Sequence, residues 1–304
     1  MKRLILNLFF FFIGLFIIDA AYGMVMIRLF EKARGGVTGK TKYICDSTRA
    51  ELVILGSSRA RMHYDPKILA DSLGMSCYNC GENGMGIIAD YAKLKILSQR
   101  YMPKMVIIDV LPILDEMTRD DNIIFVNELR PWYDRMGIDS IFWKIDKTEK
   151  IKMVSQMYKY HSKFLEYYYD GKAQLPKNGY EPSPATKIIS GKDLYQEEPR
   201  DNIIDEVKMY FAKKLIEEFK DKTKLVFVAS PRYRFKTSLT VNPLRDLCFK
   251  NNVTLIDWYA NREFVDVKEL YADGNHMNVR GATLFSKALA HHLKRNCLVK
   301  MDRG

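Results

Sequence analysis

The chain alternates short runs typical of β-strands with segments of helical periodicity. The strand-like runs are each four or five residues long and cover 51–55, 76–79, 105–109, 225–229 and 253–257. Helices that lie between successive strands favour parallel pairing through right-handed crossovers. We therefore expect an α/β fold with three layers, α/β/α, and a parallel, flavodoxin-like sheet.

The expected helices have recognisable starts and ends. They cover 66–73, 87–100, 203–220, 244–251 and 279–295, and the first of them begins with Pro66 and is closed by Gly74. Between residues 111 and 200 the alternation stops and the sequence becomes rich in Tyr and Trp. We interpret this stretch as an insertion packed on the sheet, with one helix over 148–169.

The N-terminus carries a long apolar segment. Residues 4–18 are apolar apart from one Asn, and after Asp19 the apolar character resumes as far as Phe30. As a helix, this stretch is long enough to cross a hydrocarbon core of about 30 Å. A cleaved signal peptide and an uncleaved signal anchor both fit, with Lys2 and Arg3 as the basic start. We favour the anchor because no clean A-x-A site follows, although Asp19 is costly inside a membrane.

Three regions follow from this pattern. We expect residues 1–30 to form a single-pass transmembrane anchor, 31–50 a tether and lead-in helix, and 51–304 the α/β domain with its insertion at about 111–200. Because the chain starts like an export signal, we expect the domain on the outer, periplasmic or extracytoplasmic side. The basic residues Arg28, Lys32 and Arg34 beyond the apolar run make the charge rule a weak guide to this orientation.

Charge and cysteine content limit the function classes. The 304 residues carry a formal net charge of +11, which favours anionic partners such as a phospholipid surface or an acidic polysaccharide. The charges are scattered without a nucleic-acid-binding motif, so no nucleic acid is expected. No G-x-G-x-x-G opens the first helix, and the C-x-x-C pair of Cys77 and Cys80 lacks two further ligands. We expect no metal and no cofactor, and make no prediction of the oligomeric state.

Candidate catalytic residues follow the expected strands. Ligand sites in open parallel sheets gather at the carboxyl ends of the strands. The residues found there are Ser58, Arg59, Asn83 and Gly84, and a D-x-x-H motif of Asp273 and His276 precedes the terminal helix. A histidine activates a serine hydroxyl by accepting its proton, and a carboxylate holds the imidazole in the right tautomer. We expect Ser58, His276 and Asp273 to form such a triad.

This order of motifs resembles the SGNH (GDSL-like) hydrolase superfamily. The G-D-S block resembles Gly56-Ser57-Ser58, and the N-x-x-x-x-G block resembles the stretch from Asn79 to Gly84. The D-x-x-H block resembles residues 273–276, followed by a helix start at 278–281. The resemblance implies that Ser58 is the nucleophile and that the backbone of Gly84 donates to an oxyanion. With the N-terminal segment, it points to anchored members that modify cell-envelope polysaccharides.

Two features depart from the family pattern. Ser57 replaces the family aspartate, and the third block, G-x-N-D, has no asparagine here because Asp109 stands near that place. The oxyanion site would then use backbone N–H groups or Asn83. Arg59 is a candidate for binding an anionic substrate, with pairing to a surface carboxylate as the alternative.

The predicted function is that of a serine esterase or O-acyltransferase. Its substrate would be an acylated carbohydrate or small ester, with acetyl as the expected acyl group. The alternative is a non-catalytic accessory protein that binds or positions an envelope polysaccharide, and the missing third-block asparagine motivates it.

Overall fold

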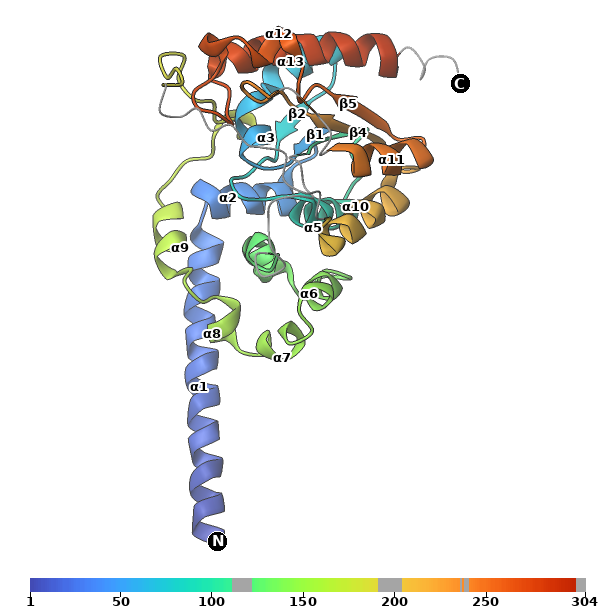
Figure 1. Ribbon diagram of the computed structural model, residues 1–304. Helices are drawn as coiled ribbons and strands as arrows, with labels where there is room; N and C mark the ends of the chain where they lie inside the picture. Colours follow the sequence, from blue (N-terminus) through green and yellow to red (C-terminus); the bar gives the residue numbers. More distant parts are fainter. Residues whose placement is uncertain (111–121, 191–203, 236, 238–240, 299–304) are drawn as a thin grey trace. The chain divides into compact units, whose positions relative to one another are not determined.

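The computed structural model describes residues 1–110, 122–190, 204–235, 237 and 241–298 (Figure 1). The chain divides into two compact units. Unit 1 comprises residues 1–43 and 127–175, and unit 2 comprises the described residues of 44–126 and 176–304. The insertion expected at about 111–200 is therefore divided, and its middle part groups with the N-terminal segment.

Unit 2 is built on a parallel sheet. Its five strands have the order β2-β1-β3-β4-β5, with bounds β1 (Leu52–Leu55), β2 (Cys77–Asn79), β3 (Met105–Asp109), β4 (Lys224–Ala229) and β5 (Thr254–Asp257). Strand β1 pairs on both sides, so that Ile54 lies opposite Asn79 and Ile107. This is the flavodoxin-like order, and the predicted fold class is confirmed.

Helices cover both faces of this sheet (Figure 1). They are α3 (Ser58–His63), α4 (Pro66–Leu73), α5 (Ile87–Ser98), α10 (Glu206–Phe219), α11 (Asn242–Lys250), α12 (Arg262–Val265) and α13 (Val279–Leu293). On one face, Ile54 and Ile107 share a core cluster with Phe285 and Leu289 of α13. On the other face, α5 packs against α10.

Local sequence signals explain the helix boundaries of unit 2. Asp65 caps α4 by accepting the backbone N–H groups of Lys67 and Ile68, and Gly74 ends it with a φ of 68°. Asn278 caps α13 in the same way. Capping residues of this kind contribute about 1 kcal/mol each, so the start of α13 next to the D-x-x-H motif is well defined.

Among the described residues of unit 1, all regular secondary structure is helical. They are α1 (Lys2–Lys32), α2 (Gly36–Lys42), α6 (Asp139–Ile145), α7 (Glu149–Lys152), α8 (Gln156–Lys159) and α9 (Phe164–Asp170), with most of the 3-10 helix η3 (Ile124–Trp132). The prediction of one helix over 148–169 is wrong. Ser155 caps a new helix with its side chain, and Ser162 has a φ of 62°, so the chain turns twice within that range.

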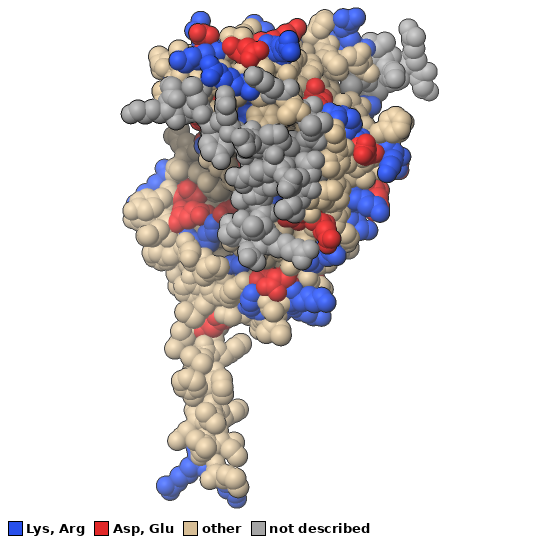
Figure 2. Space-filling view, in the orientation of Figure 1, with Lys and Arg blue, Asp and Glu red and all other residues tan. Residues whose placement is uncertain are grey.

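The first half of α1 is bare apolar surface. An 18-residue window of it has a mean hydropathy of 2.4 and none of it is buried. Figure 2 shows it as an uncharged shaft with basic side chains at its tip. By length and composition this helix could cross a membrane, as an anchor or as a signal sequence.

The second half of α1 packs inside unit 1. The carboxylate of Asp19 accepts the hydroxyl of Ser155 at 2.7 Å and the backbone N–H groups of Gln156 and Met157 at 2.8 Å. Further along, Met26 is fully buried and packs with tyrosines of the insertion. The stretch expected as a tether and lead-in helix contains α2, which is tied to α9 by a 2.9 Å bond from the N–H of Thr38 to the carboxylate of Asp170.

Candidate active site

Ser58 stands at the carboxyl end of β1, as the first residue of α3. The turn between them depends on Gly56, whose φ is 133°. A Cβ at this position would lie 2.9 Å from the backbone oxygen of Asp109 and from the Cβ of Ala60. Only glycine fits such a turn, and the turn places the serine at the edge of the sheet.

The three predicted catalytic side chains meet at this edge. The Oγ of Ser58 lies 2.7 Å from the Nε2 of His276, across 218 residues of sequence. The Nδ1 of His276 lies 2.9 Å from the Oδ1 of Asp273 and 3.0 Å from its Oδ2. A serine, an imidazole and a carboxylate thus form a continuous hydrogen-bonded chain of the type that activates a hydroxyl.

The carboxylate of this chain is held in its ionised form. Partial burial of Asp273 opposes ionisation and by itself would raise its pKa. The hydrogen bond and the electrostatic attraction of His276, together with the backbone N–H groups of Asn275 and His276, outweigh this effect of burial. The net result lowers the pKa of Asp273 to about 2. At neutral pH the group is therefore an acceptor, which orients the ring and stabilises the imidazolium that forms after proton transfer.

A second histidine, His63, supports the first from the core. It is fully buried, and its Nε2 accepts the backbone N–H of Met277 at 2.9 Å while its Nδ1 lies 3.2 Å from the hydroxyl of Ser230. Burial and the nearby Arg59 charge lower the pKa of His63 well below its usual value, so the ring is neutral. Because both ring nitrogens are engaged, His63 positions the chain beside His276 and is not available as a base.

Asn79 joins α3 to the loop after β2. Its side-chain NH₂ donates to the carbonyls of Ala60 at 2.7 Å and Tyr64 at 2.9 Å, and its carbonyl accepts the N–H of Gly81 at 2.9 Å. The loop is also held by a 3.1 Å bond from the N–H of Glu82 to the carbonyl of Gly56. The predicted second block thus lies against the turn that carries Ser58.

Gly84 and Asn83 occupy the exposed part of this loop. Gly84 has a φ of 69°, and a Cβ added to it would contact nothing within 4 Å. Among the described residues, no acceptor is found for the backbone N–H of Gly84 or of Ser58. The N–H of Asn83 donates to the carboxylate of Glu82. The N–H groups of Ser58 and Gly84 are thus free to donate to another acceptor.

Arg59 lies beneath the site, not in it. Its side chain is 1% exposed, and its guanidinium donates to the carbonyls of Val110 and Ser230 at 3.1 and 3.3 Å. Its Nε is 3.5 Å from the carboxylate of Asp109, which also accepts the hydroxyl of Tyr64. The acidic residue at the expected third block is thus neutralised by Arg59, and this arginine does not reach a substrate.

A further acidic residue below the turn, Asp90, was not predicted from the sequence. Asp90, in the first turn of α5, is 1% exposed and accepts the backbone N–H of Gly56. Burial, only partly offset by Lys93, raises the pKa of Asp90 to about 7. An acidic residue in the first turn of a helix is common, so nothing in the pattern distinguished it. No cluster of metal-binding side chains occurs among the described residues.

Comparison with known proteins gives structural likenesses only. A scan against protein-family models and a search of curated proteins give no match to the chain. A protein from Desulfitobacterium hafniense DCB-2 that is assigned to the G-D-S-L family of lipolytic proteins resembles the chain with 13% identity and a TM-score of 0.38. The match covers 79% of this chain and 97% of that one.

Two other solved structures give similar values. A protein from Lactobacillus plantarum has 11% identity and a TM-score of 0.39, with 81% of this chain and 96% of that chain covered. A further solved structure has 13% identity and a TM-score of 0.42, with 82% and 98% covered. The candidate site therefore rests on the contacts among Ser58, Asp273 and His276.

Proposed function

We propose that this chain is a serine esterase or O-acyltransferase with Ser58 as nucleophile. The observation that carries the proposal is the contact between the hydroxyl of Ser58 and the Nε2 of His276, at 2.7 Å. The fixed position of Asp273 on the other ring nitrogen supports it.

The reaction follows from this geometry. The Oγ of Ser58 attacks the ester carbonyl while its proton moves to His276, and the tetrahedral oxyanion accepts hydrogen bonds from the backbone N–H groups of Ser58 and Gly84. The C–O bond to the alcohol then breaks, and the imidazolium returns the proton to the leaving alkoxide. Water or a sugar hydroxyl next attacks the acyl-enzyme and gives its proton to His276. The bond between the acyl carbon and the Oγ of Ser58 then breaks, and the imidazolium returns the proton to Ser58. Water as acceptor makes the enzyme an esterase, and a sugar hydroxyl makes it an acyltransferase.

The substrate class that we propose is an acylated carbohydrate of the cell envelope, with acetyl as the acyl group. The resemblance to anchored polysaccharide-modifying proteins supports this, as does a helix able to hold the chain at a membrane. The test supplies an acetyl ester together with a neutral oligosaccharide. Free acetate alone indicates an esterase, and acetylated sugar indicates a transferase.

A fluorophosphonate probe tests the nucleophile directly. The full chain in detergent is expected to be labelled and to hydrolyse p-nitrophenyl acetate, and Ser58→Ala is expected to lose both. Ser57→Ala is the matched control, because the buried hydroxyl of Ser57 has no hydrogen-bond partner among the described residues. Labelling that persists in Ser58→Ala would exclude Ser58 as the nucleophile.

The competing function is a non-catalytic accessory protein. It is favoured by Asp109, which ends β3 where the family has an oxyanion-binding asparagine and which is committed to Arg59. Loss of one such donor costs about 10²–10³ in rate. A chain without this asparagine would therefore be a weak enzyme or an inactive relative, and the two differ only in the rate of turnover. Absence of labelling and turnover, with retained binding of an envelope polysaccharide, would select the accessory function.

We also propose that α1 is an uncleaved anchor and that the α/β domain lies on the outer, periplasmic or extracytoplasmic side of the membrane. The packing of residues 19–32 within unit 1 supports retention of the helix. Intact mass measurement of the protein from membranes tests cleavage. A C-terminal alkaline phosphatase fusion, active only on the outer side, tests the orientation.

A further inference from the structure

The segment that contains α7 and the first turn of α8 exposes three apolar side chains. Ile151 is 78% exposed, Val154 77% and Met157 49%, all within seven residues. Lys147 and Lys150 are exposed beside them in the sequence. We define these five residues as the 147–157 patch. Exposed apolar groups next to basic residues are typical of surfaces that meet other molecules.

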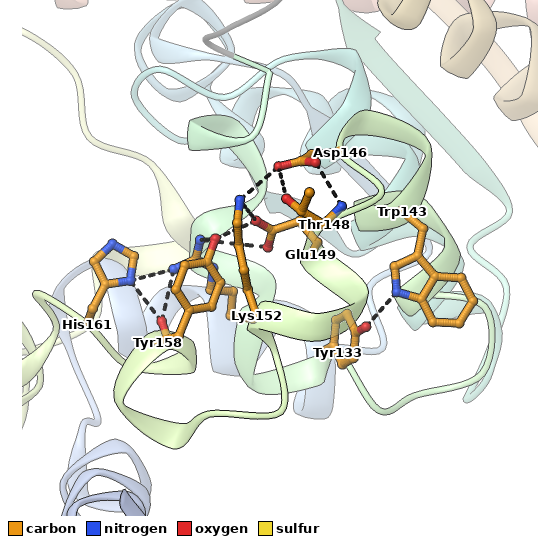
Figure 3. Close-up of polar contacts among 9 residues, drawn as sticks. Tyr133, Trp143, Asp146, Thr148, Glu149, Lys152, Tyr158 and His161 are labelled. Carbon is orange, nitrogen blue, oxygen red and sulfur yellow. Dashed lines mark hydrogen bonds and ion pairs between the residues drawn. The ribbon is translucent and has the colours of Figure 1, made fainter.

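Hydrogen bonds among buried and half-buried side chains fix the conformation of the patch. Arg130 donates to the Nδ1 of His161 at 2.6 Å and to the hydroxyl of Tyr158 at 3.1 Å, and that hydroxyl donates to the fully buried carboxylate of Glu149 (Figure 3). Lys152 bonds to Asp146 at 2.8 Å. Buried networks of this kind hold a segment in one arrangement, so the exposure of Ile151 and Val154 is a property of the folded unit.

The patch is attached to α1 at the point where the bare apolar stretch ends. Asp19 binds the backbone N–H groups of Gln156 and Met157. Gly23 permits this approach, because a Cβ there would lie 2.7 Å from the side chain of Gln156. The 147–157 patch therefore has a fixed position along the axis of α1.

The length of the bare stretch sets the depth of the patch. Residues 4–18 span about 22 Å as a helix, less than the about 30 Å of a hydrocarbon core. A membrane that covers the apolar stretch therefore extends to the level of Asp19 and of residues 155–157. At that level apolar side chains meet the acyl chains and lysines meet the headgroups.

We propose that the 147–157 patch lies in the membrane interface beside α1. Ile151, Val154 and Met157 insert at the boundary between headgroups and acyl chains, and Lys147 and Lys150 contact anionic headgroups. The proposal rests on the proposed anchoring of α1 and adds a second membrane contact from the insertion. Unit 1 is then seated on the bilayer surface in a fixed orientation.

Site-specific fluorescence in lipid nanodiscs tests the proposal. A polarity-sensitive dye is attached to Val154→Cys in the full chain, with Cys297→Ser as background because Cys45, Cys77, Cys80 and Cys248 are buried. The discs contain phosphatidylcholine and phosphatidylglycerol, with or without a lipid carrying a shallow nitroxide. We expect the nitroxide to quench most of the fluorescence at position 154 and aqueous iodide to quench little.

The matched control is Leu165→Cys on α9. Leu165 is also exposed, at 62%, but its neighbour Tyr167 packs against Phe30, with ring centroids 5.5 Å apart. Phe30 lies eleven residues beyond Asp19, or about 16 Å further along the helix. A dye at position 165 is therefore expected to be quenched by iodide and not by the nitroxide lipid.

A third dye position separates the proposed anchoring of α1 from the proposed interface position of the 147–157 patch. A dye at Leu8→Cys in α1 should be quenched by a nitroxide placed deep in the acyl chain. Quenching at position 8 without nitroxide quenching at 154 would overturn the interface proposal and leave the anchor in place. Absence of quenching at position 8 would overturn both. Protection of 154 from iodide without nitroxide quenching would show that a protein surface covers the patch, which also overturns the proposal.

Discussion

The carboxylate of Asp273 contacts His276 twice: Oδ1 lies 2.9 Å from the ring Nδ1 and also accepts the residue's backbone N–H at 2.9 Å. The D-x-x-H spacing therefore fixes both the main chain and the ring of the proposed base. With Nδ1 bound to the carboxylate, Nε2 faces Ser58 and is the nitrogen that accepts the proton.

Replacement of Asp273 by Asn is expected to remove most of the activity without unfolding the chain. An amide cannot stabilise the imidazolium and can hold the wrong tautomer, an effect worth about 10⁴ in kcat in serine hydrolases. Hydrolysis of an acetyl ester by the full chain in detergent measures it. The control is Asp71→Asn, which changes an exposed carboxylate of α4. An unchanged kcat in Asp273→Asn would contradict the proposed triad.

Arg59→Met is expected to destabilise unit 2. The substitution leaves the carboxylate of Asp109 buried without its cation, and breaking a buried ion pair from one side costs about 3–5 kcal/mol. Urea unfolding of the full chain in detergent measures the loss. The double variant Arg59→Met with Asp109→Asn should recover part of it. A stable Arg59→Met protein with a raised KM would instead indicate that Arg59 binds substrate.

The sheet, and the meeting of Ser58, His276 and Asp273 at its edge, could be predicted from local signals. The strands β1 to β4 are short runs that are almost entirely buried. The caps Asp65 and Asn278 mark helix starts by their own side-chain chemistry. In a parallel sheet the carboxyl ends of strands share an edge, so Ser58 and the D-x-x-H motif could be placed together without knowledge of distances. The contacts of His276 then agree with that placement.

The environment of charged residues was not predictable in the same way. Arg59 directly follows Ser58, and its sequence position is compatible with either a substrate-facing or a buried side chain. Its burial depends on carbonyls of two distant segments, at Val110 and Ser230. The insertion shows the same limit. The apolar spacing over 148–169 predicts one helix, but Ser155 caps a separate helix, α8, and its hydroxyl also binds Asp19 of α1.

His63→Gln is expected to change how stability depends on pH. In the folded protein burial lowers the pKa of His63 well below 6.5, so below pH 6.5 the unfolded chain binds more protons than the folded one. The free energy of unfolding therefore falls with decreasing pH, by at most about 1.4 kcal/mol per pH unit for one group. Gln keeps an acceptor for the N–H of Met277 but does not titrate, so the variant should lose this slope.

Urea unfolding of the full chain at pH 8.0, 6.5 and 5.5 measures the slope. The control is His291→Gln, an exposed histidine of α13, which should keep the wild-type slope. A His63→Gln protein whose stability falls with pH as steeply as the wild type would show that His63 is not the group responsible.

Asp19→Leu is expected to keep the chain in the membrane but to loosen α8. The change makes the apolar stretch longer and removes the acceptor of three hydrogen bonds, two of them from backbone N–H groups. Unsatisfied donors cost about 1–3 kcal/mol, so the amides of Gln156 and Met157 should exchange hydrogen roughly 10–100-fold faster. Hydrogen-exchange mass spectrometry of the full chain in nanodiscs measures this, with Asp71→Leu as control. Unchanged protection at 156 and 157 would mean that Asp19 does not hold the insertion on α1, and the depth assigned to the 147–157 patch would lose its basis.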